Sequence, residues 1–230
     1  MNTLFTDSVF FGVTISLVTY FAGNALKKKY RSALLNPLLL AIVFTIVILL
    51  VFRIDYNTYY AGAKYLSYLL TPATICLAIP LYEQFEILKK NVKAVLAGIC
   101  AGVLMSLLSI FVMALIFGFT HEQYVTFLPK SITTAIGMGV SEELGGYVAI
   151  TVAIIIITGV LGNVIGQSVC KLFRITEPVA KGIALGTASH AIGTARAMEM
   201  GEVEGALSSL SIVLAGVLTV AGVNLFAGLI

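Results

Sequence analysis

The sequence is poor in charge. Only 11% of its 230 residues are Asp, Glu, Lys or Arg, whereas soluble domains carry about a quarter. Hydrophobic residues make up 59%, and the apolar runs 36–52 and 147–166 approach or reach the roughly 20 helical residues that cross a bilayer core. The chain is therefore predicted to be an integral, multi-pass membrane protein.

Cysteine and histidine are also scarce. Cys76, Cys100 and Cys170 are widely spaced in apolar surroundings, which predicts small core residues and not a disulfide or metal framework. The sequence has no paired metal-ligand spacing, nucleophile elbow or Walker-type phosphate loop. Ser189 and His190 are neighbours that a helix points about 100° apart, so they make a poor catalytic pair. We expect no enzyme activity, no metal and no cofactor.

The basic residues predict the orientation of the helices, because cytoplasmic loops are enriched in Lys and Arg. Ten of the 14 basic residues fall in three clusters: Lys27, Lys28, Lys29 and Arg31; Lys89, Lys90 and Lys93; Lys171, Arg174 and Lys181. They lie at helix ends and not on one face, so nucleic acid is not an expected partner. "MNTLFTDSVFFG" lacks a basic region and carries Asp7, so the first helix is not expected to be a cleaved signal.

About six full crossings are predicted, at 7–26, 34–52, 63–85, 93–118, 147–170 and 205–229. If all three clusters are cytoplasmic, helices 93–118 and 147–170 are joined on the outer side. The segment 129–146 must then enter and leave the membrane on that side, and 182–201 is predicted to do the same from the cytoplasm. The predicted fold is all-α, with two opposed re-entrant hairpins.

An internal repeat supports this arrangement. "AIP" at 78–80, "AIG" at 135–137 and "AIG" at 191–193 are 57 and 56 residues apart, and each is followed by a glutamate seven residues after its isoleucine (Glu86, Glu143, Glu199). The single domain 1–230 then divides into N-terminal helices 1–60, a candidate scaffold, and the units 61–118, 119–174 and 175–230. Inverted repeats with interrupted hydrophobic segments are typical of secondary transporters.

Both hairpins are rich in hydroxyl groups and each carries a cation. In a low-charge protein such tips are suited to an anion, and arginine can bind a carboxylate through two parallel hydrogen bonds. Gly137, Gly139 and Gly193 are predicted to break the helices, and Pro129 is predicted to start one. The candidate substrate-binding residues are Lys130, Ser131, Thr133, Thr134, Thr187, Ser189, His190, Thr194 and Arg196.

Several of these residues have a simpler interpretation. Arg196 can pair with Glu199 or extend to the interface, Lys130 can lie at a solvated hairpin base, and His190 can be a structural hydrogen-bonding residue. The candidates for proton or ion coupling are Glu142, Glu143, His190 and Glu199, although Glu142 and Glu143 can equally lie at the outer surface. Gly98/Gly102, Gly162/Gly166 and Gly182/Gly186 have GxxxG spacing, which serves either a homodimer or packing within one subunit.

The stretches "LPKSITTAIGMGVSEELGG" and "GTASHAIGTARAMEMGEVEGA", together with "NPLLLA" at 36–41, resemble the LrgB/CidB family over essentially the whole chain. Members are described as antiholin-like or holin-like modulators of murein hydrolase activity, usually encoded beside a small LrgA/CidA-like membrane protein. A plastid relative moves glycolate and glycerate, and some bacterial pairs are linked to pyruvate. The resemblance implies a bacterial inner-membrane protein and a small monocarboxylate substrate.

The sequence therefore predicts an alternating-access transporter of small monocarboxylates, with or without proton coupling, that forms a homodimer in the lipid bilayer. The alternative is an antiholin-like or holin-like regulator of murein hydrolase export and lysis that acts through a small LrgA-like partner. A passive pore is disfavoured, because helices 34–52 and 147–158 lack a continuous polar face.

Overall fold

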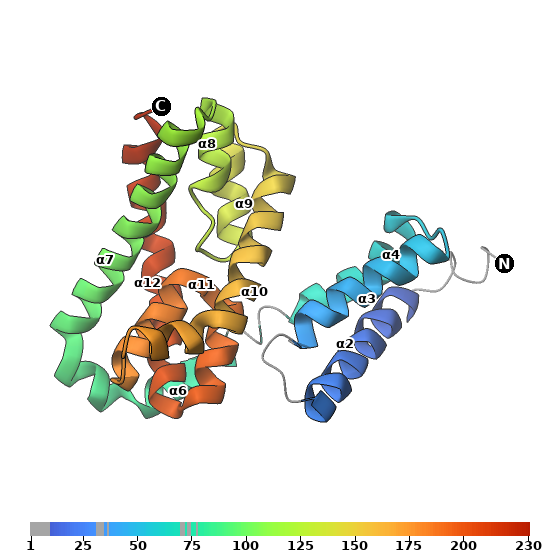
Figure 1. Cartoon of the computed structure of the whole chain (residues 1–230), viewed down its shortest axis with the longest axis horizontal. Coiled ribbons are helices and arrows are strands. Elements are labelled where there is room, and N and C mark those ends of the chain that lie inside the picture. Colours follow the sequence, from blue (N-terminus) through green and yellow to red (C-terminus); the bar gives the residue numbers. More distant parts are fainter. Residues whose placement is uncertain (1–9, 31–34, 36, 70–71, 73–74, 77) are drawn as a thin grey trace. The chain divides into compact units, whose positions relative to one another are not determined.

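The computed structural model describes residues 10–30, 35, 37–69, 72, 75–76 and 78–230, which form helices and turns. The chain divides into two compact units, unit 1 (1–76) and unit 2 (77–230) (Figure 1). Among the described helices, three are long and apolar enough to cross a membrane: Lys89–Phe117, Val148–Leu172 and Glu202–Ala227. The all-α fold is as expected, whereas the count of six crossings and the four-part division of the chain stay predictions.

In unit 1, contacts between hydroxyl groups join neighbouring helices. Helix α2 (Phe10–Tyr30) packs beside α3 (Pro37–Val51) and α4 (Tyr56–Ala63), and a 3₁₀ helix, η1 (Lys64–Leu69), follows. Thr19 Oγ1 lies 3.1 Å from Thr45 Oγ1, and Ser16 Oγ lies 2.8 Å from the Tyr59 hydroxyl. Helix α2 continues past residue 26, the predicted end, because lysines in the last turn suit the negative end of a helix. Residues 7–9 of the predicted helix lie outside the described residues.

The predicted helix 63–85 is wrong as a continuous element. Its described residues include η1 and α6 (Ala78–Glu83), and a turn at Gln84 separates α6 from α7. Residues 70–71, 73–74 and 77 of the predicted range lie outside the described residues. The 3₁₀ helix η1 and the turn at Gln84 interrupt the predicted α-helix, which the apolar composition did not indicate.

Unit 2 is built on a long helix, α7 (Phe85–Phe117), which begins eight residues before the predicted 93. Its buried residues recur every three to four positions, as expected for the core face of a helix, and pack against residues of α12 (Glu202–Ala227). Gly118 ends α7 in the left-handed conformation at φ 64°, which glycine adopts without steric cost. The buried residues of this face are Val95, Ile99, Val103, Leu107, Ile110 and Ala114.

Residues 121–147 leave one end of unit 2 and return to it. Helix α8 (His121–Phe127) begins with a capping box between Thr120 and Gln123, and α9 (Thr134–Glu143) leads back towards α10 (Val148–Leu172). Thr126 Oγ1 accepts a 2.8 Å hydrogen bond from the Tyr147 backbone N–H, so the two ends of this segment are in contact. The same end holds the C-terminus of α12, since the Tyr124 hydroxyl donates to the Phe226 carbonyl at 3.1 Å.

Helix α11 (Pro178–Met200) is a second hairpin. Ser189 and His190 have non-helical backbone angles, and His190 has φ 41° and ψ −140°. They separate a first arm (178–188) from a second arm (191–200). The arms fold back on each other, because Gly186 of the first and Thr194 of the second both contact Ser208 of α12.

The base of the α11 hairpin lies at the other end of unit 2. Lys181 near the start of the hairpin and Met200 at its end line one pocket, and Lys181 Nζ is 3.8 Å from Glu204 at the start of α12. The two hairpins thus lie at opposite ends of α12. The end with the α11 base also carries Lys171 and Arg174, so we call it the basic end. Whether either hairpin enters a membrane stays a prediction.

Glycines let three helices approach the first arm closely. A Cβ atom on Gly102 of α7 would lie 2.6 Å from Thr187 Cγ2, and one on Gly166 of α10 would lie 2.5 Å from Leu185 Cδ2. Gly186 on the arm itself lies against the Ser208 backbone of α12. All three GxxxG pairs therefore serve packing within one subunit, which leaves the predicted homodimer without support from these glycines.

The cysteines are only partly as expected. Cys170 is buried, but Cys76 and Cys100 are exposed on this chain. Small apolar residues are tolerated on an apolar outer surface as well as in a core, so composition alone did not separate the two environments.

Gly186→Ala should destabilise unit 2 by about 1–3 kcal/mol, because the new methyl group would overlap the Ser208 backbone of α12. Gly139→Ala is the matched control, since a Cβ there meets nothing within 4 Å and alanine is the better helix former. Thermal unfolding in detergent measures both. Equal stability of the two variants would contradict this account of the packing.

Candidate functional site

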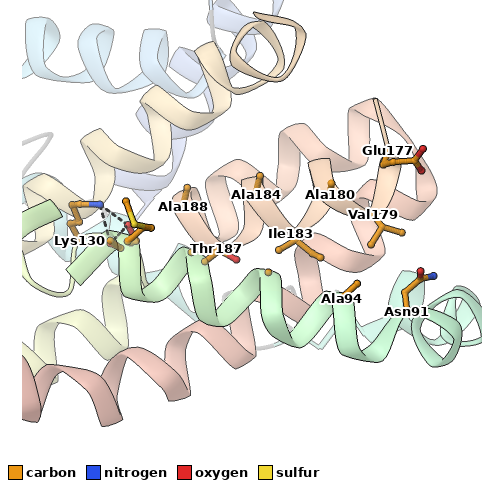
Figure 2. Close-up of a pocket in the computed structure, with 15 residues that line it drawn as sticks. Asn91, Ala94, Lys130, Glu177, Val179, Ala180, Ile183, Ala184, Thr187 and Ala188 are labelled. Carbon is orange, nitrogen blue, oxygen red and sulfur yellow. Dashed lines mark hydrogen bonds between the residues drawn. The ribbon is translucent and has the colours of Figure 1, made fainter. Parts of the chain in front are cut away.

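Unit 2 contains a cavity of about 760 Å³ between α7, the first arm of α11 and the loop 128–133. Figure 2 shows it running along the arm from Glu177 and Asn91 at the basic end to Lys130 at its inner end. We call it the α7–α11 cavity. Ala180, Ala184 and Ala188 recur every four residues on the arm, and their small side chains leave room for the cavity.

The loop 128–133 brings a cation to the inner end. Lys130 Nζ donates to Ser106 Oγ of α7 at 3.1 Å and to Ser131 Oγ at 3.0 Å (Figure 2). Ser106 Oγ in turn donates to Ser131 Oγ at 3.1 Å. No carboxylate among the described residues forms an ion pair with Lys130. An ammonium has three protons to donate, so this group is suited to an anion.

Thr187 adds an unused hydroxyl group. Its side chain is 4% exposed, it lines the α7–α11 cavity, and its Oγ1 forms no hydrogen bond with any described residue. A buried hydroxyl without a partner costs about 1–3 kcal/mol, so such groups in native proteins call for an explanation. A ligand oxygen in the cavity would supply the missing partner.

The repeat in the sequence relates two of these residues. A spacing of 56 aligns Ser131 with Thr187, and both line the α7–α11 cavity, Ser131 from the loop 128–133 and Thr187 from the first arm of α11. The inner end of the cavity is therefore where equivalent positions of the two repeats come together.

Three of the nine predicted substrate-binding residues line this cavity: Lys130, Ser131 and Thr187. Thr133 is instead the N-cap residue of α9, and Thr134 is its first residue. Pro129 lies in the turn before them and does not start the helix. Thr133 and Thr134 are half-buried and belong to the hairpin 121–147 without reaching the cavity.

Ser189 and His190 face α10 instead of the α7–α11 cavity. Ser189 packs on Gly162, the His190 ring packs on Gly159, and His190 Nε2 lies 3.0 Å from the Ile155 carbonyl oxygen. This contact matches the structural interpretation that the sequence left open for His190.

The second arm places the remaining candidates elsewhere. Thr194 Oγ1 bonds the His190 carbonyl at 3.0 Å and lies 2.7 Å from Ser208 Oγ. Arg196 pairs with Glu199, as the simpler interpretation expected, and also bonds Gln167 of α10. Both arginine contacts lie towards the basic end, away from Lys130.

The predicted coupling glutamates are outside the cavity as well. Glu142 and Glu143 are exposed at the end of α9, and Glu199 is half exposed beside Arg196. Among the described residues, no group of three His, Cys, Asp or Glu side chains is placed to hold a metal ion.

The three predicted helix breaks are wrong. Gly137 and Gly139 lie inside the continuous helix α9, and Gly193 lies inside the second arm of α11. Gly137 gives room to Ile155, while a Cβ on Gly193 would lie 2.5 Å from Ser189 Cβ and 2.8 Å from the Leu185 carbonyl. Gly137 and Gly193 therefore serve close packing, and Gly139 faces open space.

Sequence reasoning missed Ser106. Ser106 is one of two serines in the largely apolar helix α7, and only its contact with Lys130 and Ser131 reveals its place. The GxxxG spacing at Gly98 and Gly102 was the available signal that this face of α7 approaches another helix.

The comparisons with known proteins agree on one family. The model of the LrgB-like family matches residues 16–229. Proteins named holin-like protein CidB from Staphylococcus aureus strains Mu50 / ATCC 700699, N315 and MW2 are each 39% identical over 207 residues, which is 90% of this chain and 90% of each relative. No solved structure matches.

Thr187→Val should leave the free energy of unfolding unchanged or raise it slightly, because the hydroxyl that it removes has no partner. Thr194→Val removes an equally buried hydroxyl that has two partners, and should cost about 1–3 kcal/mol. Denaturation of both variants in the same detergent measures the difference. An equal loss of stability would show that the Thr187 hydroxyl has a structural hydrogen-bonding partner and is not available to a ligand.

Proposed function

The chain belongs to the LrgB-like family, and we propose that it is a membrane carrier of small organic monocarboxylates that binds its substrate in the α7–α11 cavity. The observation that supports this most is Lys130, an ammonium that has no carboxylate partner among the described residues and lies at the inner end of an otherwise largely apolar cavity. Ser106, Ser131 and the unpaired Thr187 hydroxyl surround the same place.

The proposed chemistry follows from the charges. Lys130 lies at the opposite end of the cavity from Glu177, so the inner end favours one negative charge, and a low-dielectric surround strengthens that attraction. The three hydroxyl groups provide hydrogen-bonding partners for further oxygen atoms of the ligand, as on a 2-hydroxy or 2-oxo acid. Apolar neighbours such as Met105 and Ile183 suit a short carbon chain.

The proposed movement uses the two hairpins. We place both in the membrane, entering from opposite sides, because non-helical backbone at that depth is tolerated where it is buried in protein or lines a cavity. Small rigid shifts of the α11 hairpin against α7 would open the cavity to one side at a time. The cavity now extends to the basic end, which the distribution of Lys and Arg assigns to the cytoplasm.

A second candidate has support of a different kind. The relatives named above are called holin-like, and this name favours a role in membrane permeability and lysis, with or without a small LrgA-like partner. That name says nothing of a carboxylate. A holin-like protein need not bind its solute, so it has no use for a half-buried cation without a described carboxylate partner and a buried hydroxyl in a cavity.

Proteoliposomes holding the purified chain should take up labelled pyruvate, glycolate, glycerate or lactate saturably. Lys130→Gln should weaken the apparent affinity about 10- to 100-fold, the value of a charge-assisted hydrogen bond. Lys93→Gln is the matched control, because Lys93 is an exposed lysine of α7 that does not line the cavity. No saturable uptake by folded protein, under any imposed gradient, would contradict the carrier.

The same vesicles loaded with a fluorescent dye larger than the cavity separate the two candidates. A carrier should retain the dye while it moves the acid. Release of dye and acid together, unaffected by Lys130→Gln, would favour the holin-like function. The measurement should be repeated with the small LrgA-like protein if the chain alone moves neither.

A further inference from the structure

The basic end holds a second pocket, separate from the α7–α11 cavity. It has a volume of about 470 Å³ and lies between the end of α10, the connection 173–177 and the two arm ends of the α11 hairpin. Lys171, Arg174 and Lys181 line it, together with Gln167 and Thr176. None of the described residues that line it is acidic.

The local charge balance leaves an excess of two cations. Lys181 has a partner, since its Nζ lies 3.8 Å from Glu204, which is 7% exposed. Lys171 and Arg174 form no ion pair with a described carboxylate. The nearby arginine, Arg196, is neutralised by Glu199 and bonds Gln167, which also lines the pocket.

Arg174 occupies a position that favours glycine. Its φ is 54°, and the hydrogen bonds from Arg174 N–H to the Lys171 carbonyl at 3.1 Å and from Ile175 N–H to the Cys170 carbonyl at 2.8 Å form a Schellman cap. A residue with a Cβ costs about 1 kcal/mol in this conformation. The cap itself does not require arginine, and Arg174 lines the pocket.

We propose that this pocket binds a phosphate group, either the headgroup of an anionic phospholipid or free phosphate. Guanidinium and ammonium groups bind phosphate oxygens through charge-assisted hydrogen bonds. Basic pockets between membrane helices on the cytoplasmic side suit anionic headgroups, and the distribution of Lys and Arg assigns this end to the cytoplasm. The phosphate would connect the end of α10 to the base of the α11 hairpin. This proposal does not rest on the carrier function.

The test is lipid binding to the purified full-length chain, counted by native mass spectrometry. Phosphatidylglycerol should bind with a Kd at least tenfold lower than zwitterionic phosphatidylcholine. Arg174→Gly and Lys171→Gln should each weaken phosphatidylglycerol binding about fivefold, the value of one cation near an anionic surface. Lys181 is left unchanged, because its loss would leave Glu204 buried without a partner.

Arg174→Gly has a matched control within the chain. Arg53 follows α3 in the same kind of cap, at φ 51° with Ile54 N–H bonded to the Leu49 carbonyl, and it does not line this pocket. Both glycine variants should relieve the same backbone strain, so neither should unfold. Arg53→Gly should keep the full affinity for phosphatidylglycerol.

The source of the phosphate is decided by competition. Displacement of the lipid by millimolar inorganic phosphate would assign the pocket to free phosphate, and its absence would assign it to the headgroup. Equal binding of the two lipids together with no binding of inorganic phosphate would overturn the proposal. So would phosphate binding that Arg174→Gly and Lys171→Gln leave unchanged, and neither result would bear on uptake of monocarboxylates.

Discussion

The close approach of three helices to the first arm of α11 is the constraint on which the rest of unit 2 depends. Apolar side chains gain little by association in lipid, so helices there are held by packing of small residues and by hydrogen bonds. Gly102 of α7, Gly166 of α10 and Gly186 of the arm each remove a Cβ at a contact. The arm is thereby fixed in rotation as well as in position, and each of its faces has one neighbour.

That fixed rotation decides which polar groups are available. Thr187 faces α7, Ser189 and His190 face α10, and Thr194 faces α12. The α7–α11 cavity lies on the α7 side, where Ala180, Ala184 and Ala188 have small side chains. The loop 128–133 then closes the inner end with Lys130, and Ser106 of α7 orients that lysine. A single unpaired cation is left in a low-charge surround.

The sequence predicted the elements of unit 2 better than their contacts. Apolar length located α7, α10 and α12, and the alternation of basic clusters required a reversal within 182–201, where the α11 hairpin lies. Glycine was a poor guide to the turn, since Gly193 packs between the arms while His190 takes the positive φ. Hydroxyl-rich composition indicated a polar site, but it did not say which of Thr187, Ser189 and Thr194 shares the cavity. That choice follows from the place of each residue, on the first arm, at the bend or on the second arm, and from which neighbour supplies each partner.

The most direct test of the central claim, that an anion binds where the two hairpins meet, is protection of a cysteine in the α7–α11 cavity. Cys76, Cys100 and Cys170 would be replaced by alanine, and Ala188→Cys or Ala195→Cys introduced. Both alanines are exposed, on different arms of α11, and only Ala188 lines the cavity. The account predicts that a water-soluble maleimide labels residue 188 and that lactate slows this reaction severalfold without affecting residue 195. Failure of every small carboxylate to protect residue 188, with both cysteines reactive, would contradict it.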